Sequence, residues 1–257
     1  MISSSQNPKI KWVRALQAHS RKRREAGAFV IEGVRLAEEA LAADWEASLA
    51  LYSEELNERG RAVVEAFAAR GVPVEAATPQ VLRAASDTET PQGLLVVLAL
   101  KPLPAPREPD FVLIPDGVRD PGNLGTMLRS AAAAGVQAVF CPPETVDAFS
   151  PKVVRAGMGA HFRLPVCALS WDEIAARLRP LRVYLAAADE GVSIYRANFR
   201  LPLAIIVGGE AQGAGREARR LATEVVHIPM PGGGESLNAA AAASILMFEV
   251  ARQRAGA

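Results

Sequence analysis

The sequence predicts an α/β protein with two domains joined by a proline-rich linker, and two observations predict this class. Short apolar segments typical of buried strands alternate with segments of helical periodicity along most of the chain. At residues 101–109, four prolines in nine residues interrupt the alternation, and such a segment forms neither a helix nor a central strand. We therefore expect a first domain at residues 1–100 and a second domain at 110–257.

The first domain is expected to be a small α/β domain. Apolar segments predict strands at residues 29–32, 48–52, 72–76 and 93–100. Amphipathic segments predict helices at residues 34–43 and 61–70. Gly71 follows the second of these helices, where a left-handed glycine commonly ends a helix.

The second domain repeats this alternation over a longer stretch. Strands are predicted at residues 111–114, 136–141, 163–166, 182–187, 203–207 and 225–228. Helices are predicted at residues 123–134, 151–157, 171–178, 217–221 and 237–254. Apolar strands joined by helical connections predict a parallel sheet that helices cover on both faces.

The composition is that of an ordinary folded protein. Of 257 residues, 50% are hydrophobic and 22% are charged, with a net charge of +1, which excludes a disordered or fibrous chain. No apolar run approaches ~18–20 residues, and the N-terminal segment lacks the apolar core of a signal peptide, so we expect a cytoplasmic protein with no membrane partner. Cys141 and Cys167 are far apart and the histidines are scattered, so no metal site is expected.

Basic residues are concentrated near the N-terminus. Residues 1–35 contain eight basic side chains and two acidic ones. Such a cluster is able to contact the phosphates of a nucleic acid, but it is equally typical of a solvated helix face. The candidate RNA-binding residues are Arg21, Lys22, Arg23, Arg24 and Arg35.

Three further segments each follow a predicted strand, at the end where α/β proteins place ligands. The first, residues 116–130, contains Asp-Pro-Gly-Asn-Leu-Gly-Thr and then Arg129. Arg129 lies about 9 Å beyond Asn123 along a helix, and helical side chains lean back toward the N-terminus. The pair therefore suits an anionic or ribose-phosphate group, although a capped helix with a surface arginine is the alternative.

The second segment ends a buried strand in two glycines and a carboxylate, Gly208, Gly209 and Glu210. Glycines allow a backbone to approach a ligand closely. A Walker phosphate loop is excluded because Arg216 and Glu217 stand where Lys and Ser or Thr are required, and the glycine fingerprint of Rossmann-type dehydrogenases is missing. A flexible strand-to-helix turn is the alternative interpretation.

The third segment precedes the last helix and combines apolar, glycine and amide residues. One Ser or Asn there would be an ordinary N-cap, but two of them after a triple glycine favour a loop that wraps a flat apolar ligand with polar edges, such as adenine. The residues concerned are Ile228, Met230, Gly233, Ser236, Leu237 and Asn238.

Together the three segments resemble the signature motifs of the SpoU/TrmH family of RNA ribose 2′-O-methyltransferases, in the SPOUT class. The resemblance covers about residues 110–250, and residues 2–11 and 29–36 resemble the substrate-binding extension of members that act on large-subunit ribosomal RNA or similar RNAs. It implies a metal-independent methyl transfer from S-adenosylmethionine to 23S-type ribosomal RNA, with S-adenosylhomocysteine as product. It also implies a deep trefoil knot and a homodimer formed through the second domain, whereas general folding rules alone would reject a knot.

By matching position, the resemblance also assigns roles to residues. It implies a catalytic group of Asn123, Arg129, Glu210, Ser236 and Asn238. It implies cofactor contacts from Gly208, Gly209, Ile228, Met230, Gly233, Ser236 and Leu237.

Two matters stay open at this point. Arg129 is the family's candidate base, but a guanidinium remains protonated, so we prefer a clamp on the adjacent phosphate. A transfer RNA methyltransferase, a resistance enzyme that methylates ribosomal RNA, and a non-catalytic RNA-binding module of the same fold are the alternative functions. The pairing of Asn123 with Arg129 beside an intact Ser-Leu-Asn favours an enzyme over a pure binder.

Overall fold

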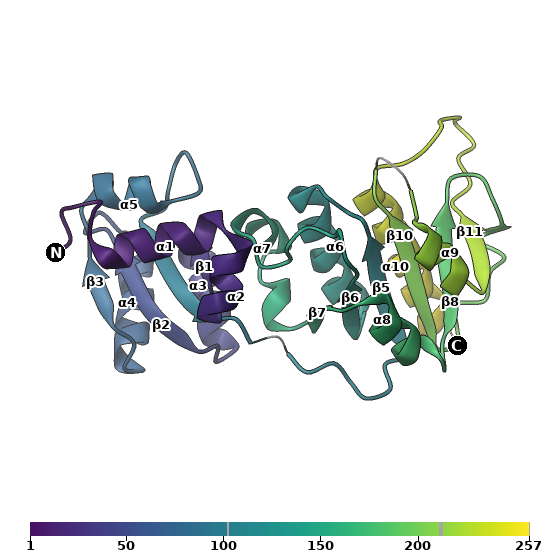
Figure 1. The fold of residues 1–257 in the computed structure, drawn as a ribbon, viewed down its shortest axis with the longest axis horizontal. Coiled ribbons are helices and arrows are strands. Elements are labelled where there is room, and N and C mark those ends of the chain that lie inside the picture. The colour runs from purple at the N-terminus through teal and green to yellow at the C-terminus, as the bar shows by residue number, and fades with distance from the viewer. Residues whose placement is uncertain (102, 211–212, 257) are drawn as a thin grey trace. The chain divides into compact units, whose positions relative to one another are not determined.

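The computed structural model describes three stretches of the chain, residues 1–101, 103–210 and 213–256 (Figure 1). Pro102 in the expected linker, and Ala211 and Gln212 in the glycine turn, lie outside the described residues. The rest of the linker, residues 103–109, forms neither helix nor strand, as its prolines predict.

Two compact units make up the chain. Their members are Met1–Lys101 with Phe149–Phe162 in the first unit, and Pro102–Ala148 with Arg163–Ala257 in the second. The first unit thus includes a segment that interrupts the second unit in sequence.

The sheet of the first unit consists of β1 (Ala28–Glu32), β2 (Ala47–Tyr52), β3 (Val74–Ala76) and β4 (Leu94–Ala99). Its strand order is β1-β4-β2-β3. β4 is antiparallel to both β1 and β2, and β3 is parallel to β2, so the sheet is mixed. Each of the four strands overlaps a strand that its apolar residues predict, so these predictions are confirmed.

The helices within this part of the chain are α1 (Pro8–Ala18), α2 (Ser20–Ala26), α3 (Val34–Ala42), α4 (Glu58–Ala69) and α5 (Pro79–Ala85). α3 and α4 confirm the predicted helices, but α1, α2 and α5 were not predicted. α1 and α5 bury Ile10, Leu16 and Leu82 in one core with sheet residues such as Leu51 and Val97. Their apolar stripes are short and interrupted by basic or small residues, so the periodicity was too weak to detect.

The segment Phe149–Phe162 contains α7 (Pro151–Gly157) and a 3₁₀ turn, and it packs on β1 of the first unit. The Phe149 ring lies edge-on to Phe29 with ring centroids 5.1 Å apart, and Phe162 lies edge-on to Trp45 at 5.2 Å. The sequence pattern predicts this segment as part of the second domain. Its aromatic side chains pair with partners more than a hundred residues away, which no local pattern reveals.

The sheet of the second unit is parallel and has seven strands, in the order β7-β6-β5-β10-β8-β11-β9. They are β5 (Phe111–Asp116), β6 (Ala138–Cys141), β7 (Val166–Ala168), β8 (Arg182–Ala187), β9 (Val192–Ser193), β10 (Leu203–Gly208) and β11 (Glu224–His227). The predicted parallel sheet is confirmed. β7 begins three residues later than predicted, and the two-residue β9 was too short to predict.

Helices cover both faces of this sheet (Figure 1). α8 (Trp171–Leu178) and α9 (Arg216–Leu221) contribute Ile174, Leu178 and Ala218 to a core with alternate residues of the strands. α10 (Ala239–Ala255) packs against β10 and against α6 (Pro121–Ala134), and a hydrogen bond of 2.8 Å joins Ser244 to Ser130 between the two helices. None of the described helices is long and apolar enough to cross a membrane.

Candidate active site

The parallel register brings the loops that follow several strands to one edge of the second sheet. Gly208 at the end of β10 lies beside Asp116 at the end of β5, and His227 at the end of β11 lies beside Ala187 at the end of β8. Because parallel strands all end at the same edge, the three predicted motifs leave the sheet side by side.

A hydrogen-bonded chain joins these three motifs through Asn123. Its side-chain amide donates to the Glu210 carboxylate, and its amide oxygen accepts a hydrogen bond of 3.0 Å from the Asn238 amide. Both ends of Asn123 are therefore engaged by residues that follow it by 87 and 115 positions. The structure thus brings three of the five predicted catalytic residues into contact.

Local structure holds the two asparagines in place. Asp120 is the N-cap of α6, and its carboxylate accepts a hydrogen bond of 2.8 Å from the Asn123 backbone N–H. Asn238 is the N-cap of α10, and its side-chain oxygen accepts from the backbone N–H groups of Ala240 and Ala241. The start of α10 therefore orients the Asn238 amide, and the cap of α6 fixes the backbone of Asn123.

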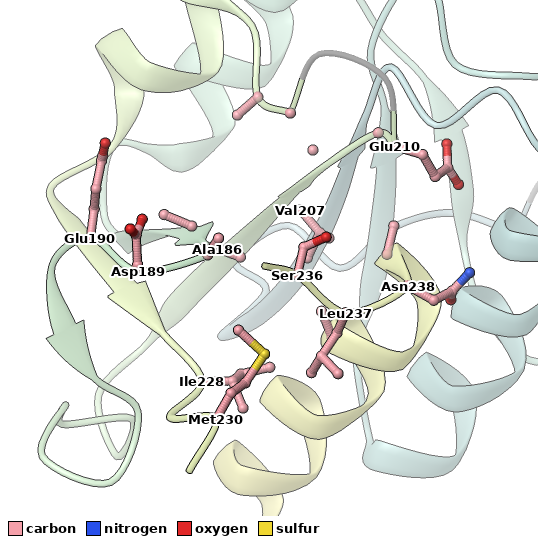
Figure 2. Close-up of a pocket in the computed structure, with 18 of the residues that line it drawn as sticks. Ala186, Asp189, Glu190, Val207, Glu210, Ile228, Met230, Ser236, Leu237 and Asn238 are labelled. Atoms are coloured by element: carbon pink, nitrogen blue, oxygen red, sulfur yellow. The ribbon is translucent and has the colours of Figure 1, made fainter. Parts of the chain in front are cut away.

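A cavity of about 530 Å³ lies beside this network, at the ends of β8, β10 and β11 (Figure 2). Ile228, Met230 and Leu237 line it with apolar surface, and Leu237 is 40% exposed although it is large and apolar. Ser236 and the backbone of Gly208 and Gly209 complete the predicted part of the lining. The volume lies within the range of about 300–1,000 Å³ that is usual for ligand pockets.

The two glycines after β10 are required by close packing of the backbone. A Cβ at Gly208 would lie 2.3 Å from the Ala214 nitrogen, and one at Gly209 would lie 2.2 Å from the Gly117 oxygen. No side chain fits at either distance. These glycines therefore let the first and second motifs touch, in addition to lining the cavity.

Gly233 differs from our expectation of a cofactor contact. It is exposed, has a φ of +76°, and is not among the described residues that line the cavity. Its N–H donates to the Met230 carbonyl over 3.0 Å. Gly233 therefore turns the loop between Met230 and Ser236, because its backbone adopts a conformation that other residues disfavour.

Arg129 is exposed on α6, two turns after Asn123. It makes no hydrogen bond or ion pair with any described residue, and it does not line the cavity. Our expectation that it reaches back to the Asn123 loop is therefore not met by a direct contact in this structure. An uncommitted guanidinium on the surface is free to bind an anion from solution.

The cavity also contains residues that our sequence analysis missed. Residues 186–190, at the end of β8 and just after it, line the cavity, and Asp189 and Glu190 lie on the side opposite Glu210 (Figure 2). Glu190 lies 3.8 Å from Arg219 in an exposed ion pair. The rule that ligands bind at strand carboxyl ends would have found these two acids, because they directly follow a correctly predicted strand.

Two groups at this edge have perturbed acidity. Burial raises the pKa of the Asp116 carboxyl, the N–H of Gly215 opposes that rise by donating to it over 2.7 Å, and Glu144 adds to the rise. Burial also raises the pKa of the Cys141 thiol to about 12, so this thiol is protonated at neutral pH and is no nucleophile. No group of His, Cys, Asp and Glu able to hold a metal occurs within the described stretches.

The comparisons with known proteins agree with this geometry. The family model described as SpoU rRNA Methylase family matches residues 110–248, and the MRM3-like substrate binding domain matches residues 7–96. The first match covers more than half of the chain and includes all three motifs. The chain belongs to the SpoU rRNA methylase family.

Relatives of this SpoU chain match nearly its whole length. The 23S rRNA (guanosine(2553)-2′-O)-methyltransferase RlmP of Bacillus subtilis is 34% identical over 97% of this chain and 98% of its own. The AdoMet-bound rRNA methyltransferase from Sinorhizobium meliloti has a TM-score of 0.87, is 30% identical, and matches 98% of this chain and 97% of its own. The SpoU methyltransferase AviRb from Streptomyces viridochromogenes, in complex with AdoMet, has a TM-score of 0.84 at 27% identity over 98% of this chain and all of its own.

The basic cluster lies within the substrate-binding match of this SpoU protein. Arg24 and Arg35 are exposed, and Arg21 and Lys22 both pair with Glu25 on the surface of α2. Arg23 is the exception, since only 3% of it is exposed and it donates to the carbonyls of Leu16 and Gln17. Its predicted phosphate contact is therefore corrected: Arg23 holds the end of α1 against α2.

Proposed function

We propose that this protein transfers a methyl group from S-adenosylmethionine to the ribose 2′-hydroxyl of a guanosine in large-subunit ribosomal RNA. The observation that carries the proposal is the hydrogen-bonded chain from Glu210 through Asn123 to Asn238, beside a cavity lined by Ile228 and Met230. The relatives support the substrate, because the B. subtilis protein is named as a guanosine 2′-O-methyltransferase of 23S rRNA.

The cavity residues fit the methyl donor. Ile228, Met230 and Leu237 offer apolar surface for a flat adenine, and the exposed backbone after β8 and β10 offers donors and acceptors for its polar edge. Asp189 and Glu190 add two carboxylates that suit ribose hydroxyls and a cationic group. The two solved relatives with AdoMet bound support this assignment. When bound, the donor supplies a methyl group activated by a sulfonium.

The catalytic residues then position the nucleophile. Glu210 uses one carboxylate oxygen for Asn123, and its second oxygen remains to accept a hydrogen bond from the ribose hydroxyl. Arg129 clamps the adjacent phosphate and stabilises the negative charge that develops on the ribose oxygen. Alignment of the reacting atoms is the largest expected contribution, because the reaction needs no covalent intermediate.

The first unit would hold RNA away from the reacting nucleotide. Its match to the MRM3-like substrate binding domain supports this role. The exposed members of the basic cluster, Arg21, Lys22, Arg24 and Arg35, would contact phosphates. The free thiols of Cys141 and Cys167 fit the reducing environment of the cytoplasm, where we place the reaction.

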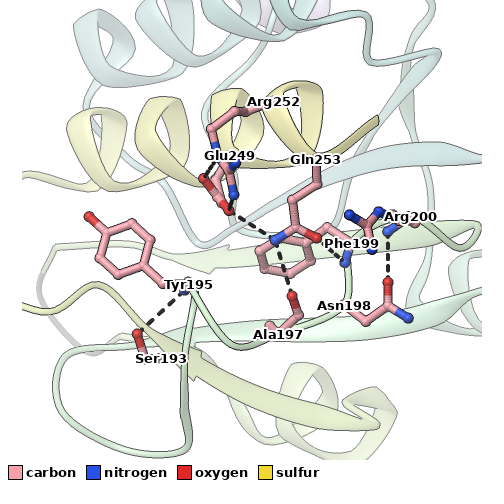
Figure 3. Close-up of polar contacts among 9 residues, drawn as sticks. All are labelled: Ser193, Tyr195, Ala197, Asn198, Phe199, Arg200, Glu249, Arg252 and Gln253. Atoms are coloured by element: carbon pink, nitrogen blue, oxygen red, sulfur yellow. Dashed lines mark hydrogen bonds and ion pairs between the residues drawn. The ribbon is translucent and has the colours of Figure 1, made fainter. Parts of the chain in front are cut away.

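The second unit would form a homodimer through α10. Ile245 and Phe248 expose 39% and 50% of their surface on one side of this helix, and Tyr195 is 65% exposed. Figure 3 shows how Gln253 fixes the neighbouring segment, donating to the Ala197 carbonyl and accepting from the Phe199 N–H. Exposed aromatic and aliphatic side chains on a rigid surface are typical of a subunit interface.

We also propose that the C-terminal segment of the second unit forms a deep trefoil knot. β10 lies between β5 and β8, although β6, β7 and β8 all precede it in sequence, and α10 then packs on β10 and α6. A strand that comes late in the sequence but lies in the middle of the sheet supports a threaded path of the chain.

Incubation of the protein with radiolabelled S-adenosylmethionine and either total ribosomal RNA or total transfer RNA tests the function. We expect label in large-subunit ribosomal RNA, resistant to alkali at one ribose when the modified nucleotide is mapped. Label in transfer RNA alone would show that transfer RNA, and not ribosomal RNA, is the substrate. RNA binding without any transfer of label would indicate that the protein is a non-catalytic RNA-binding module of the same fold.

A further inference from the structure

A second cavity, of about 440 Å³, lies beside Gly209, Glu210 and Gly213, which follow β10. The end of β5, the loop after β6 and the first residues of α8 and α9 form its walls, with Asp116, Arg119, Trp171 and Arg216 among the lining residues. The proposed site for the methyl donor does not include this cavity. Its lining combines the buried carboxylate of Asp116, an indole, two guanidiniums and the carboxylates of Glu144, Glu210 and Glu217.

We propose that this cavity binds the base of the guanosine whose ribose is methylated. The proposal rests on the proposed function and deepens it, because it names the part of the protein that recognises the nucleotide. The ligand class is a purine base with two adjacent N–H donors on its Watson–Crick edge, attached to a ribose phosphate.

The position of the cavity connects it to the reacting ribose. Gly209, Glu210 and Gly213 line both this cavity and the cofactor cavity, so the two cavities share one wall. Glu210 in that wall accepts the hydrogen bond from Asn123. A nucleoside whose 2′-hydroxyl meets Glu210 carries its base on the same sugar, within reach of the second cavity.

Asp116 provides the recognition chemistry. Only 7% of the residue is exposed, and the N–H of Gly215 donates to its Oδ2 over 2.7 Å, which fixes the orientation of the carboxylate. No described residue donates to Oδ1, so this oxygen remains available as an acceptor. An ionised carboxylate only accepts hydrogen bonds, and each of its oxygens has two lone pairs. Oδ1 and the remaining lone pair of Oδ2 therefore match the N1–H and 2-amino group of guanine and oppose the acceptor N1 of adenine.

The remaining side chains suit the rest of a nucleotide. Trp171 packs partly against the core that contains Ile174, and it also lines the cavity, so a base finds an apolar wall there. Arg119 pairs with Glu144 over 2.8 Å, but both side chains are about two-thirds exposed or more, so a phosphate readily replaces the pair. Arg216 is exposed and has no ion pair in the part of the chain that the structure describes.

The test measures binding of guanosine, inosine and adenosine 5′-monophosphates to the full chain saturated with S-adenosylhomocysteine. Fluorine NMR of protein labelled with 5-fluorotryptophan reports binding, and Trp171→Phe assigns the signal of that residue. We expect guanosine monophosphate to shift the Trp171 signal and to bind about tenfold more tightly than the inosine nucleotide, which lacks one hydrogen-bond donor. Equal affinity for the three nucleotides, or no change at Trp171, would overturn the inference.

Two substitutions separate recognition from structure. Asp116→Asn keeps an oxygen for the Gly215 N–H but presents an amide to the base, so we expect the preference for guanosine to disappear while affinity for S-adenosylhomocysteine stays the same. Asp172→Asn, at an exposed residue beside Trp171 that does not line the cavity, is the matched control and should keep the preference. A preference that survives Asp116→Asn would refute the role of Asp116.

Methyl transfer to ribosomal RNA is measured with the same proteins. The results distinguish a failure of the base-binding inference from a failure of the proposed function. If the wild type methylates RNA and Asp116→Asn leaves its KM for RNA unchanged, the base site is wrong and the proposed function stands. If the wild type transfers no methyl group but binds guanosine monophosphate through Asp116, the base site stands and the proposed function is wrong.

Discussion

The side-chain amide of Asn123 donates a hydrogen bond to the carboxylate of Glu210, which lies 87 residues later in the chain. Asn123 lies in the first turn of α6, and Glu210 lies in the loop that follows β10, so local structure alone does not bring the two residues together. The contact therefore joins the first and second motifs at the centre of the proposed site.

Replacement of Asn123 by Ala should lower kcat about hundredfold, because Glu210 then loses the partner that orients it toward the nucleophile. Affinity for S-adenosylmethionine should stay within about twofold, since Asn123 does not line the cofactor cavity. Single-turnover methyl transfer and calorimetric titration of the donor measure the two effects. Ala133→Ser, on an exposed residue of the same helix outside the first motif, is the control. A variant with wild-type kcat would remove Asn123 from the mechanism.

Replacement of Arg129 by Lys tests the phosphate clamp. A lysine keeps the charge but loses the planar pair of donors, so we expect kcat/KM for RNA to fall at least about tenfold. The Arg129→Ala variant should show a larger fall in kcat/KM for RNA, because it also loses the charge. Steady-state kinetics with ribosomal RNA measures this, and near-full turnover of the Lys variant would contradict a geometry-specific clamp.

The exposed basic residues should control salt-dependent RNA binding. Combined replacement of Arg24 and Arg35 by Ala should weaken binding and flatten the slope of log affinity against log salt, by about 0.7–0.9 for each phosphate that the variant no longer neutralises. Filter binding between roughly 50 and 200 mM salt measures this slope. An unchanged slope would exclude phosphate contacts by these side chains.

Arg23 should respond differently from its neighbours. Because it is buried against the carbonyls of Leu16 and Gln17, Arg23→Ala should lower the free energy of unfolding by about 1–3 kcal/mol. Urea denaturation measures the loss, with Arg24→Ala as the exposed control. If the two variants are equally stable, Arg23 has no structural role.

If the proposed homodimer forms through α10, replacement of Phe248 by Arg should convert it into monomers, because a charge would enter the apolar surface that Ile245 and Phe248 expose. Light scattering coupled to gel filtration measures the mass of both proteins. Arg182→Glu, at an exposed residue at the start of β8, is the control. A variant that stays dimeric would place the interface elsewhere.

The stability of the second unit should depend on the ionisation of Asp116. Burial raises the pKa of this carboxyl above its ordinary value of 3.8, so the folded protein binds this proton more readily than the unfolded chain does. The ionised group therefore destabilises the fold at neutral pH, and stability is gained as the pH falls from the raised pKa toward 3.8.

Asp116→Asn should consequently unfold at a higher urea concentration than the wild type at pH 7, and the difference should shrink toward pH 4. Urea denaturation at both pH values measures this, since the midpoint reports stability when the slope is unchanged. A variant less stable than the wild type at pH 7 would mean that the carboxylate's bond to Gly215 outweighs the cost of its burial.

Elements with a strong local pattern were predictable. The bounds of α7, α8 and β8 match the predicted ranges. A Ser before the first residue marks the start of both helices, and a run of apolar residues marks the strand. α1 and α5 were missed because their apolar residues gain meaning only when they cover the sheet that also contains Leu51. Local patterns contain no information about such distant partners.

Local sequence and tertiary structure also determine different features of the candidate site. The sequence alone determined the α/β class, the three motifs and the residue types that suit a methyl donor, because these depend on neighbours in the chain. Only the tertiary structure decided that Asn123 meets Glu210 and Asn238, that Arg23 is buried, and that Asp116 opens into a second cavity. Parallel pairing of β10 between β5 and β8 is the physical reason, since it joins loops that are about a hundred residues apart at one edge of a sheet.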